Sequence, residues 1–317
     1  MKTLYITQKL PAAADIWLQK TALDREIFPE PHPIPREILL QKIKMADGLI
    51  CMLSDAIDAD LMDAAPKLKV ICNYAVGTNN IDLEAARARN IIVCNTPGVL
   101  THATAELTWA LILAAARRLT ESERFLRAGK FIGWQPTLLI GTELFGKTLG
   151  IIGSGRIGQR VAQIGHAFGM EILYSRSRNP DLEKACNAKL SEFGDILKNS
   201  DIISLHVPLT PENKRLITMR ELKMMKSSAI LINTARGPIV NEADLATALQ
   251  QKIIAAAGLD VFEKEPLVHP GLLALENLVL LPHIGSATER ARNAMAKMVI
   301  EDAAAVLNGQ SPKNRVV

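Results

Sequence analysis

Aromatic residues and cysteines are scarce in this sequence. Phe, Trp and Tyr make up 4% of the 317 residues, and the four cysteines are Cys51, Cys72, Cys94 and Cys186. None of them belongs to a CxxC pair, and no group of Cys and His residues has the spacing of a zinc site. The sequence therefore predicts no metal site, and cysteines buried as small apolar side chains in a reducing cytosol.

Long apolar runs and a strong excess of one charge are also missing. The most apolar helical stretch, 109–116, is far shorter than the roughly 20 residues that cross a bilayer. Polar residues at 7–9 interrupt the N-terminus too early for a signal peptide. The formal net charge is +4, and the basic residues are scattered. We therefore expect a cytoplasmic protein without membrane or nucleic-acid partners.

Short apolar runs alternate with helical patterns along the chain, and the length favours two domains. Strands are expected at 4–7, 48–53, 70–73, 91–94, 148–152, 171–174, 202–206, 229–233, 255–259 and 278–281. Long helices are expected from 101 to about 118 and from about 288 to 307. This alternation predicts an α/β protein with two doubly wound parallel sheets.

A glycine motif stands where the alternation restarts in the second half of the chain. Gly153, Gly155 and Gly158 match GxGxxG, directly after an expected strand and before a helical stripe. The first glycine permits a tight turn, the second lets the backbone approach a pyrophosphate, and the third lets the helix pack closely on the strand. The context predicts a dinucleotide site at a helix N-terminus. The alternative is a glycine-rich turn without a ligand.

The next expected strand ends in Ser175, Arg176, Ser177 and Arg178, where NAD-selective sites carry an acidic residue. A carboxylate there would repel a 2′-phosphate, whereas a hydroxyl and two guanidinium groups would bind one. The basic ending therefore predicts a preference for NADP(H), with NAD(H) as the alternative cofactor. Alternatively, these arginines belong to a solvated loop.

Three further motifs each follow an expected strand and contain Arg236, Glu265 and His283. They fall at the carboxyl edge, where doubly wound sheets bind ligands. A guanidinium can hold a carboxylate, an imidazole can exchange protons near neutral pH, and a carboxylate can orient that imidazole. With a nicotinamide as hydride donor, the trio suits reduction of a 2-keto acid. Singly, each has an ordinary alternative: a surface arginine, a turn glutamate and a hydrogen-bonded core histidine.

Seven motifs together give the chain a resemblance that covers nearly its whole length. They are NYAVGTNNID (73–82), NTPGVLTHATAE (95–106), GIIGSGRIGQ (150–159), HVPLTPEN (206–213), NTARG (233–237), LDVFEKEP (259–266) and PHIGSAT (282–288). In this combination the sequence resembles the D-isomer-specific 2-hydroxyacid dehydrogenase family, and most closely its glyoxylate/hydroxypyruvate reductase branch.

The resemblance implies a flavodoxin-like substrate-binding domain from 1–100 and 287–317, with a Rossmann cofactor domain, 101–286, inserted in it. It implies that Arg236, Glu265 and His283 are catalytic. The implied cofactor contacts are Thr104, Gly153, Ser154, Gly155, Arg156, Ile157, Gly158, Ser175, Arg176, Ser177, Arg178, Val207, Pro208, Thr234, Ala235, Asp260, His283 and Gly285. The implied substrate contacts are Leu53, Val76, Gly77, Arg236 and Trp134.

The activity implied is nicotinamide-dependent reduction of small 2-keto acids to D-2-hydroxy acids, and the basic ending at 175–178 adds the preference for NADPH. Family members are usually homodimers, and here residues 102–146 would form the dimer interface. Trp134 would then reach the neighbouring active site or be a plain aromatic residue of the interface. Two other functions stay open: a 3-phosphoglycerate or other D-2-hydroxyacid dehydrogenase that uses NAD, and a nucleotide-sensing protein resembling the corepressor relatives.

Overall fold

Two sheets of parallel strands organise the computed structural model, which describes residues 2–175 and 177–317. The chain divides into unit 1, up to Leu100 and again from Ser286 to Val317, and unit 2, Thr101–Gly285. Unit 2 thus ends one residue before the boundary expected from the sequence. Both units are α/β, and the predicted fold class of two doubly wound parallel sheets is confirmed. In the described part of the chain, no helix is long and apolar enough to cross a membrane.

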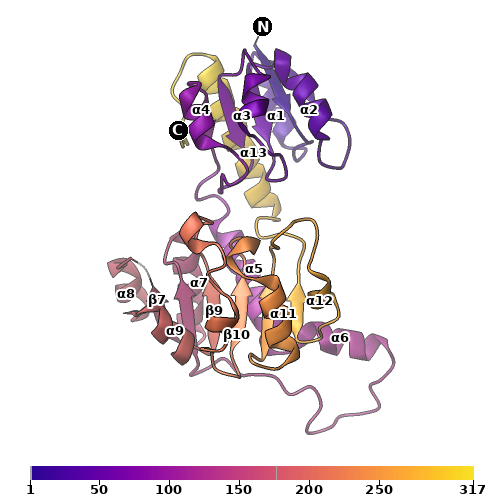
Figure 1. Ribbon diagram of the computed structural model, residues 1–317, viewed down its shortest axis with the longest axis vertical. Helices are drawn as coiled ribbons and strands as arrows, with labels where there is room; N and C mark the ends of the chain where they lie inside the picture. Colours follow the sequence, from indigo (N-terminus) through magenta and orange to yellow (C-terminus); the bar gives the residue numbers. More distant parts are fainter. Residues whose placement is uncertain (1, 176) are drawn as a thin grey trace. The chain divides into compact units, whose positions relative to one another are not determined.

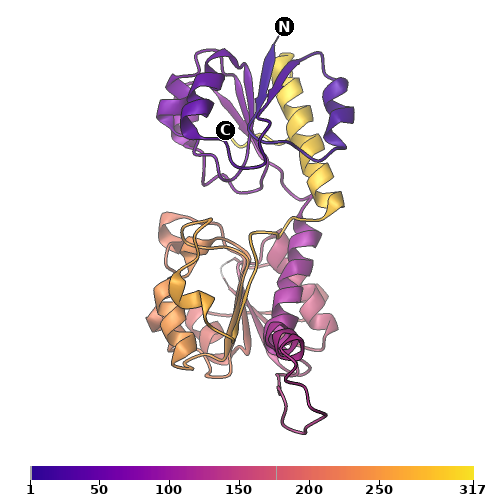
Figure 2. The same ribbon diagram turned by 90° about the vertical axis from the view of Figure 1, so that its right-hand side faces the viewer.

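Unit 1 has a five-stranded sheet in the order β2-β1-β3-β4-β5, the flavodoxin-like order. The strands are β1 (Thr3–Ile6), β2 (Asp24–Ile27), β3 (Gly48–Cys51), β4 (Val70–Asn73) and β5 (Ile92–Cys94). The helices are α1 (Ala14–Gln19), α2 (Arg36–Lys42), α3 (Ala59–Asp63), α4 (Leu83–Ala88) and α13 (Glu289–Leu307). Figure 2 shows α13, in yellow, with α1, in indigo, beside it on one face of this sheet, and the purple helices of the first hundred residues on the other face.

Burial explains which strands of unit 1 the sequence pattern found. All residues of β3 and β4 are buried, so these strands are continuous apolar runs, as expected for the middle of a parallel sheet. The edge strand β2 has the sequence DREI, and three of its four residues are exposed. It has no apolar signal, and the sequence analysis missed it together with α1.

Unit 2 has a seven-stranded parallel sheet in the order β12-β11-β10-β9-β6-β7-β8. Its strands are β6 (Thr148–Ile152), β7 (Glu171–Ser175), β8 (Lys189–Leu190), β9 (Ile202–Leu205), β10 (Ile230–Asn233), β11 (Ala256–Leu259) and β12 (Leu278–Leu280). Its helices are α5 (Thr101–Ala116), α6 (Leu119–Arg127), α7 (Arg156–Ala167), α8 (Pro180–Cys186), α9 (Phe193–Asn199), α10 (Met219–Leu222), α11 (Glu242–Gln250) and α12 (Pro270–Leu273).

The strand order of unit 2 reverses at β6, which lies between β7 and β9. Such a reversal opens a crevice at the carboxyl ends of the strands, where doubly wound sheets bind ligands. Helices α5 and α7 cover one face of the sheet, and the helices that follow β9 cover the other (Figures 1 and 2). The loops after β6, β7, β9, β10, β11 and β12 therefore end at one edge of the sheet.

The long helix expected at 101–118 is interrupted. It ends at Ala116, and Arg118 adopts a left-handed conformation (φ 53°) from which the separate helix α6 starts. Arg118 forms an ion pair with Glu121 at 2.6 Å, which favours this turn. Beyond α6 the chain leaves the body of unit 2 as a loop (Figure 2). This arm, 128–146, exposes the large apolar side chains Phe131, Ile132, Trp134, Ile140 and Phe145.

Candidate active site

The turn between β6 and α7 contains the glycine motif. Gly153 has φ 102°, and a Cβ at that residue would lie 2.7 Å from the carbonyl oxygen of His206. A Cβ on Gly158 would lie 2.1 Å from the carbonyl oxygen of Gly153. In contrast, a Cβ on Gly155 would meet no atom of the described residues within 4 Å, and Gly155 caps α7 without a side-chain hydrogen bond. Packing thus requires glycine at residues 153 and 158. Gly155 instead faces open space in front of the first N–H groups of α7, and such a space suits a pyrophosphate.

The end of β7 holds the predicted ribose-recognition residues. Ser175 is buried, and its Oγ has no hydrogen-bond partner among the residues that the structure describes. The carbonyl of Ser177 accepts a hydrogen bond of 3.3 Å from the Ser154 hydroxyl in the glycine turn. The Arg178 side chain is 73% exposed and lies 3.3 Å from a Glu183 carboxylate oxygen. Arg176 lies outside the described residues. A hydrogen bond therefore joins the β6–α7 turn and the loop after β7, the two loops that would surround an adenosine ribose.

His283 and Glu265 form a hydrogen-bonded pair. Nδ1 of His283 lies 2.7 Å from Oε2 of Glu265, and the other carboxylate oxygen accepts a bond of 3.0 Å from the N–H of Phe262. Burial by itself would raise the pKa of Glu265. The pKa of Glu265 is nevertheless lowered, because three groups stabilise the charged form: His283 by its hydrogen bond and charge, the Phe262 N–H, and the charge of Arg236. Glu265 is therefore a carboxylate that fixes the imidazole through Nδ1 and leaves Nε2 for a ligand.

The loop that carries His283 is held by Asp260, a buried residue at the end of β11. Its two carboxylate oxygens accept hydrogen bonds of 2.7 Å from the N–H groups of Ile284 and Gly285. Burial raises the pKa of Asp260 despite these two bonds and the charge of His283. His283 itself has a left-handed backbone (φ 53°), which is uncommon for a residue with a Cβ. Asp260, predicted as a cofactor contact, thus also fixes the backbone of the two residues that follow His283.

Arg236 follows β10 in a turn built by Asn233. The Asn233 side chain donates to the carbonyl of Arg236 (2.9 Å) and accepts from the N–H of Ala235 (3.0 Å). Burial lowers the pKa of Arg236, while the nearby charge of Glu265 raises it. A Cβ on Gly237 would lie 1.8 Å from the backbone of Phe262, so the turn passes directly over the segment that leads to Glu265. The guanidinium is therefore held in the same region as the His283–Glu265 pair.

The other predicted cofactor contacts of unit 2 gather at the same sheet edge. The Thr108 hydroxyl lies 2.8 Å from that of Thr234 and donates to the carbonyl of Thr104. A Cβ on Gly285 would lie 3.5 Å from Thr104. Val207 is buried against Gly153, and Pro208 is exposed. Arg156 and Ile157 form the first turn of α7, and Ala235 lies between Thr234 and Arg236.

The predicted substrate loop of unit 1 follows β4. Side-chain amides from Asn73 and Asn95 donate to the carbonyls of Gly77 and Val76, each at 2.7 Å. These bonds fix the carbonyl side of the loop without using the N–H groups of Val76 and Gly77. Leu53 lies half-buried in the turn after β3.

Known proteins resemble the chain along its whole length. Residues 109–285 match the family described as "D-isomer specific 2-hydroxyacid dehydrogenase, NAD binding domain". A glyoxylate reductase of Aeropyrum pernix is 52% identical over 300 residues, which cover 92% of this chain and 89% of that protein. The chain belongs to the D-isomer specific 2-hydroxyacid dehydrogenase family.

Solved structures share the fold of the chain. A Thermus thermophilus protein superposes with a TM-score of 0.94 at 45% identity, covering 99% of this chain and 100% of that one. An NADPH-dependent glyoxylate/hydroxypyruvate reductase of Sinorhizobium meliloti, in complex with NADP and malonate, gives a TM-score of 0.85 at 30% identity, covering 100% and 97%. The protein is thus a nicotinamide-dependent oxidoreductase, and both the family and the enzyme class predicted from the sequence are confirmed.

Three positioning residues of this dehydrogenase were missed in the sequence: Asn73, Asn95 and Asn233. Each stands at or just after the carboxyl end of a strand, and each side chain bonds to the backbone of a nearby loop. An asparagine that follows an apolar run is a signal for such a turn. Among the described residues, no group of three or more His, Cys, Asp or Glu side chains could hold a metal ion.

Proposed function

We propose that this dehydrogenase reduces glyoxylate and related small 2-keto acids, including hydroxypyruvate, to D-2-hydroxy acids, with NADPH preferred over NADH. The observation that carries the proposal is the 2.7 Å contact between His283 and Glu265 beside the buried charge of Arg236. The Aeropyrum relative, named a glyoxylate reductase, supports the substrate class.

Cofactor binding is proposed at the edge of the sheet in unit 2. The glycine turn and the N-terminus of α7 would hold the pyrophosphate, and Thr104, Thr234 and Asp260 would lie towards the nicotinamide. When bound, the reduced nicotinamide supplies the hydride that reduces the carbonyl carbon. The chain's own part is to place and protonate the substrate.

Arg236 would hold the substrate carboxylate through two parallel hydrogen bonds, since a guanidinium matches a carboxylate in shape and charge. His283 would give the proton on Nε2 to the carbonyl oxygen as that oxygen gains charge. Glu265 would stabilise the charged imidazole and keep its ring in place. Val76 and Gly77 would offer N–H groups to the substrate carboxylate, and Leu53 would contact its small end.

The cofactor preference rests on the end of β7. Ser177 and Arg178 offer a hydroxyl group and a guanidinium, and Ser175 has a buried hydroxyl group, whereas an NAD-selective strand ends in an acidic residue. Arg176 is proposed to act with Arg178 on the 2′-phosphate. The Sinorhizobium structure, described as NADPH-dependent, supports this choice.

A substrate panel tests the proposal. Steady-state rates with glyoxylate, hydroxypyruvate, pyruvate, 3-phosphohydroxypyruvate and longer 2-keto acids would be measured with NADPH and with NADH, together with product chirality. We expect the highest kcat/KM for glyoxylate or hydroxypyruvate with NADPH, and D products where the product is chiral. A higher kcat/KM for NADH would refute the cofactor preference, and a maximum with the phosphorylated acid would favour the alternative dehydrogenase. Binding of NADPH without turnover would favour a nucleotide sensor.

The assembly is proposed to be a homodimer that buries α5, α6 and the arm. Large apolar side chains are exposed on this segment, which favours a protein partner. Trp134, 84% exposed, is proposed to approach the neighbouring active site. A cytoplasmic location remains a prediction from the sequence.

A further inference from the structure

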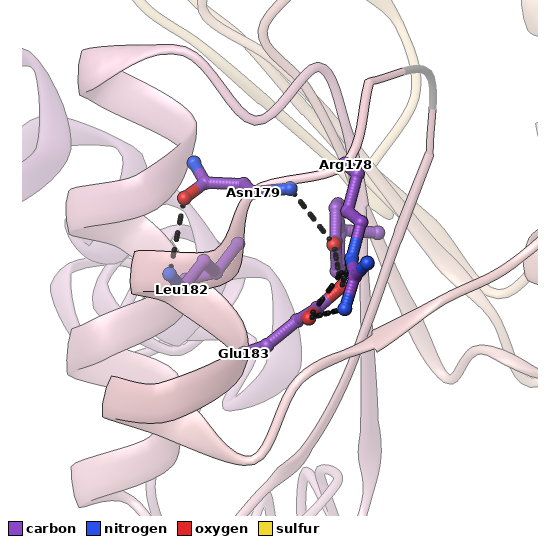
Figure 3. A network of polar contacts seen from close by, with 5 residues as sticks. Arg178, Asn179, Leu182 and Glu183 are labelled. Atoms are coloured by element: carbon purple, nitrogen blue, oxygen red, sulfur yellow. Dashed lines mark hydrogen bonds and ion pairs between the residues drawn. The ribbon is translucent and has the colours of Figure 1, made fainter.

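A carboxylate lies beside the arginine that would recognise the 2′-phosphate. Glu183, on α8, faces Arg178 from the next turn of chain after β7 (Figure 3). Nε of Arg178 lies 3.4 Å from each Glu183 oxygen, and Nη2 lies 3.3 Å from one of them. Charge-assisted contacts of this kind are usually about 2.7–2.9 Å long. The guanidinium is therefore loosely held and free to turn towards another anion.

The carboxylate, in contrast, is firmly held. The hydroxyl of Tyr174, a residue buried in β7, donates to Glu183 at 2.7 Å and accepts a bond of 3.0 Å from the N–H of Asn179. The Tyr174 hydrogen bond first, and Arg178 second, lower the pKa of Glu183 below its ordinary value, so the side chain is ionised at neutral pH. A negative charge thus stays in place even when Arg178 moves.

The same loop is fixed to the glycine turn. The Asn179 side chain donates to the carbonyl of Ser154 (3.0 Å) and accepts from the N–H of Leu182 (3.0 Å). The second bond caps the N-terminus of α8. Asn179 thereby joins the turn that would hold the pyrophosphate, the end of β7 and the helix that carries Glu183. These bonds fix the start of α8 beside the end of β7, and the Tyr174 hydroxyl holds the Glu183 carboxylate on that helix.

We infer that Glu183 is a specificity-determining residue that limits the preference for NADPH over NADH. A 2′-phosphate bound by Arg178 would share that guanidinium with Glu183 and feel its negative charge. The phosphate carries about −1.5 to −2 charges at neutral pH, so the repulsion acts on NADPH and not on NADH. The inference rests on the proposed function, because it takes Arg178 as a 2′-phosphate ligand.

The test compares Glu183→Gln with the parent protein. Glutamine keeps an oxygen for the Tyr174 hydroxyl and removes the charge. Isothermal titration calorimetry of the full-length protein would give the Kd of adenosine 2′,5′-bisphosphate and of 5′-AMP, two probes that differ by the 2′-phosphate. We expect Glu183→Gln to lower the Kd of the bisphosphate about 3- to 10-fold, as for a nearby exposed charge in water. The Kd of 5′-AMP should stay unchanged.

Two controls separate charge from position. Asp181→Asn makes the same charge change at an exposed residue of α8 that is not among the described contacts of Arg178, and we expect a much smaller change in Kd. At about 1 M KCl, where the Debye length is roughly 3 Å, the gain from Glu183→Gln should disappear. The ratio of kcat/KM for NADPH and NADH should rise in parallel with the calorimetric change.

The outcomes are distinct. An unchanged or higher Kd of the bisphosphate in Glu183→Gln would overturn the role of Glu183 as a repulsive charge. Arg178→Ala distinguishes this failure from failure of the underlying proposal. If Arg178→Ala weakens bisphosphate binding while Glu183→Gln does not strengthen it, only the present inference is wrong. If Arg178→Ala changes nothing, Arg178 does not recognise the 2′-phosphate and both fall.

Discussion

At the scale of single residues, His283 gains its proposed role from its neighbours. Glu265 occupies Nδ1, and Asp260 fixes the two residues that follow the histidine. The left-handed backbone at His283 is retained because these contacts over-determine the loop. The same side chain on a flexible loop would have the chemistry without the direction.

Replacing the imidazole should therefore affect the chemical step most. We expect His283→Asn to lower kcat about 10²- to 10⁴-fold with a small change in KM, since it removes proton transfer. Steady-state kinetics with glyoxylate and NADPH would measure this. A variant that retains near-normal kcat would show that His283 is not the proton donor.

The carboxylate partner of His283 should matter for turnover over a wide pH range. Burial raises the pKa of Glu265, but the hydrogen bond and charge of His283 outweigh it and lower that pKa, so Glu265 stays a carboxylate at neutral pH. Glu265→Gln should therefore lower kcat/KM for keto-acid reduction at least about tenfold at each pH from 5 to 10. A variant with near-normal kcat/KM across this range would mean that Glu265 only supports the structure.

His206 behaves differently from His283. It follows β9, its Nε2 lies 2.8 Å from the Ser204 hydroxyl, and its carbonyl lies against Gly153. Desolvation lowers the pKa of His206 from 6.5 to about 3. The folded protein therefore keeps this imidazole neutral at a pH where the unfolded chain would bind a proton.

A stability change with pH follows from this difference. As pH falls below about 6.5 towards 3, the unfolded chain gains a proton at His206 and the folded protein does not, so the free energy of unfolding falls. The slope from one group is at most about 1.4 kcal/mol per pH unit. Urea unfolding at pH 7, 5.5 and 4 should show a smaller decline in His206→Gln than in the parent protein. Parallel declines would contradict the assignment.

At the scale of elements, the β6–α7 turn divides its glycines between folding and binding. The position of Gly158 is filled by the backbone of Gly153, whereas the position of Gly155 is open. The φ of Gly155 is −68°, which any residue can adopt. One motif therefore contains glycines with two different physical requirements.

Alanine substitutions should separate the two requirements. Gly158→Ala should lower the free energy of unfolding by at least about 2 kcal/mol, because backbone atoms must shift. Gly155→Ala should change the free energy of unfolding by no more than about 1 kcal/mol, the scale of a helix-cap change. It should weaken NADPH binding at least about tenfold, because a methyl group would enter the space left for the pyrophosphate. Urea unfolding and calorimetry measure both. Tight NADPH binding by Gly155→Ala would place the pyrophosphate elsewhere.

At the scale of the whole molecule, the arm after α6 is the main exposed apolar segment that the functional site does not explain. Ile132 is 87% exposed and Trp134 is 84% exposed. Side chains of this size are seldom left in water together unless another protein surface covers them. This supports the proposed homodimer.

A charged substitution in the arm tests this assembly. We expect the parent protein to sediment as a dimer and Ile132→Asp to shift towards the monomer mass, because a buried unpaired carboxylate is costly. The matched control is Ile16→Asp, since Ile16 is also apolar and exposed (57%) but lies in α1. A parent protein that sediments as a monomer would refute the dimer.

Local signals determined much of this molecule in advance. Periodicity located the buried strands such as β4 and β6, which match their predicted bounds. The glycine motif located the β6–α7 turn, because a tight turn and close packing impose requirements on individual residues. The motifs around Arg236, Glu265 and His283 identified the family, which the comparisons confirmed.

Only the tertiary structure decided how these residues work together. The 2.7 Å contact between residues 265 and 283, the hold of Asp260 on the histidine loop and the hydrogen bond from Asn179 to Ser154 each join separate segments of chain. The edge strand β2, charged and exposed, had no pattern to reveal it. The physical reason is the distance along the chain over which each effect acts. Periodicity and turn preferences depend on neighbours in the sequence. Contact distances, desolvation and the resulting pKa shifts depend on which distant residues the packing brings together.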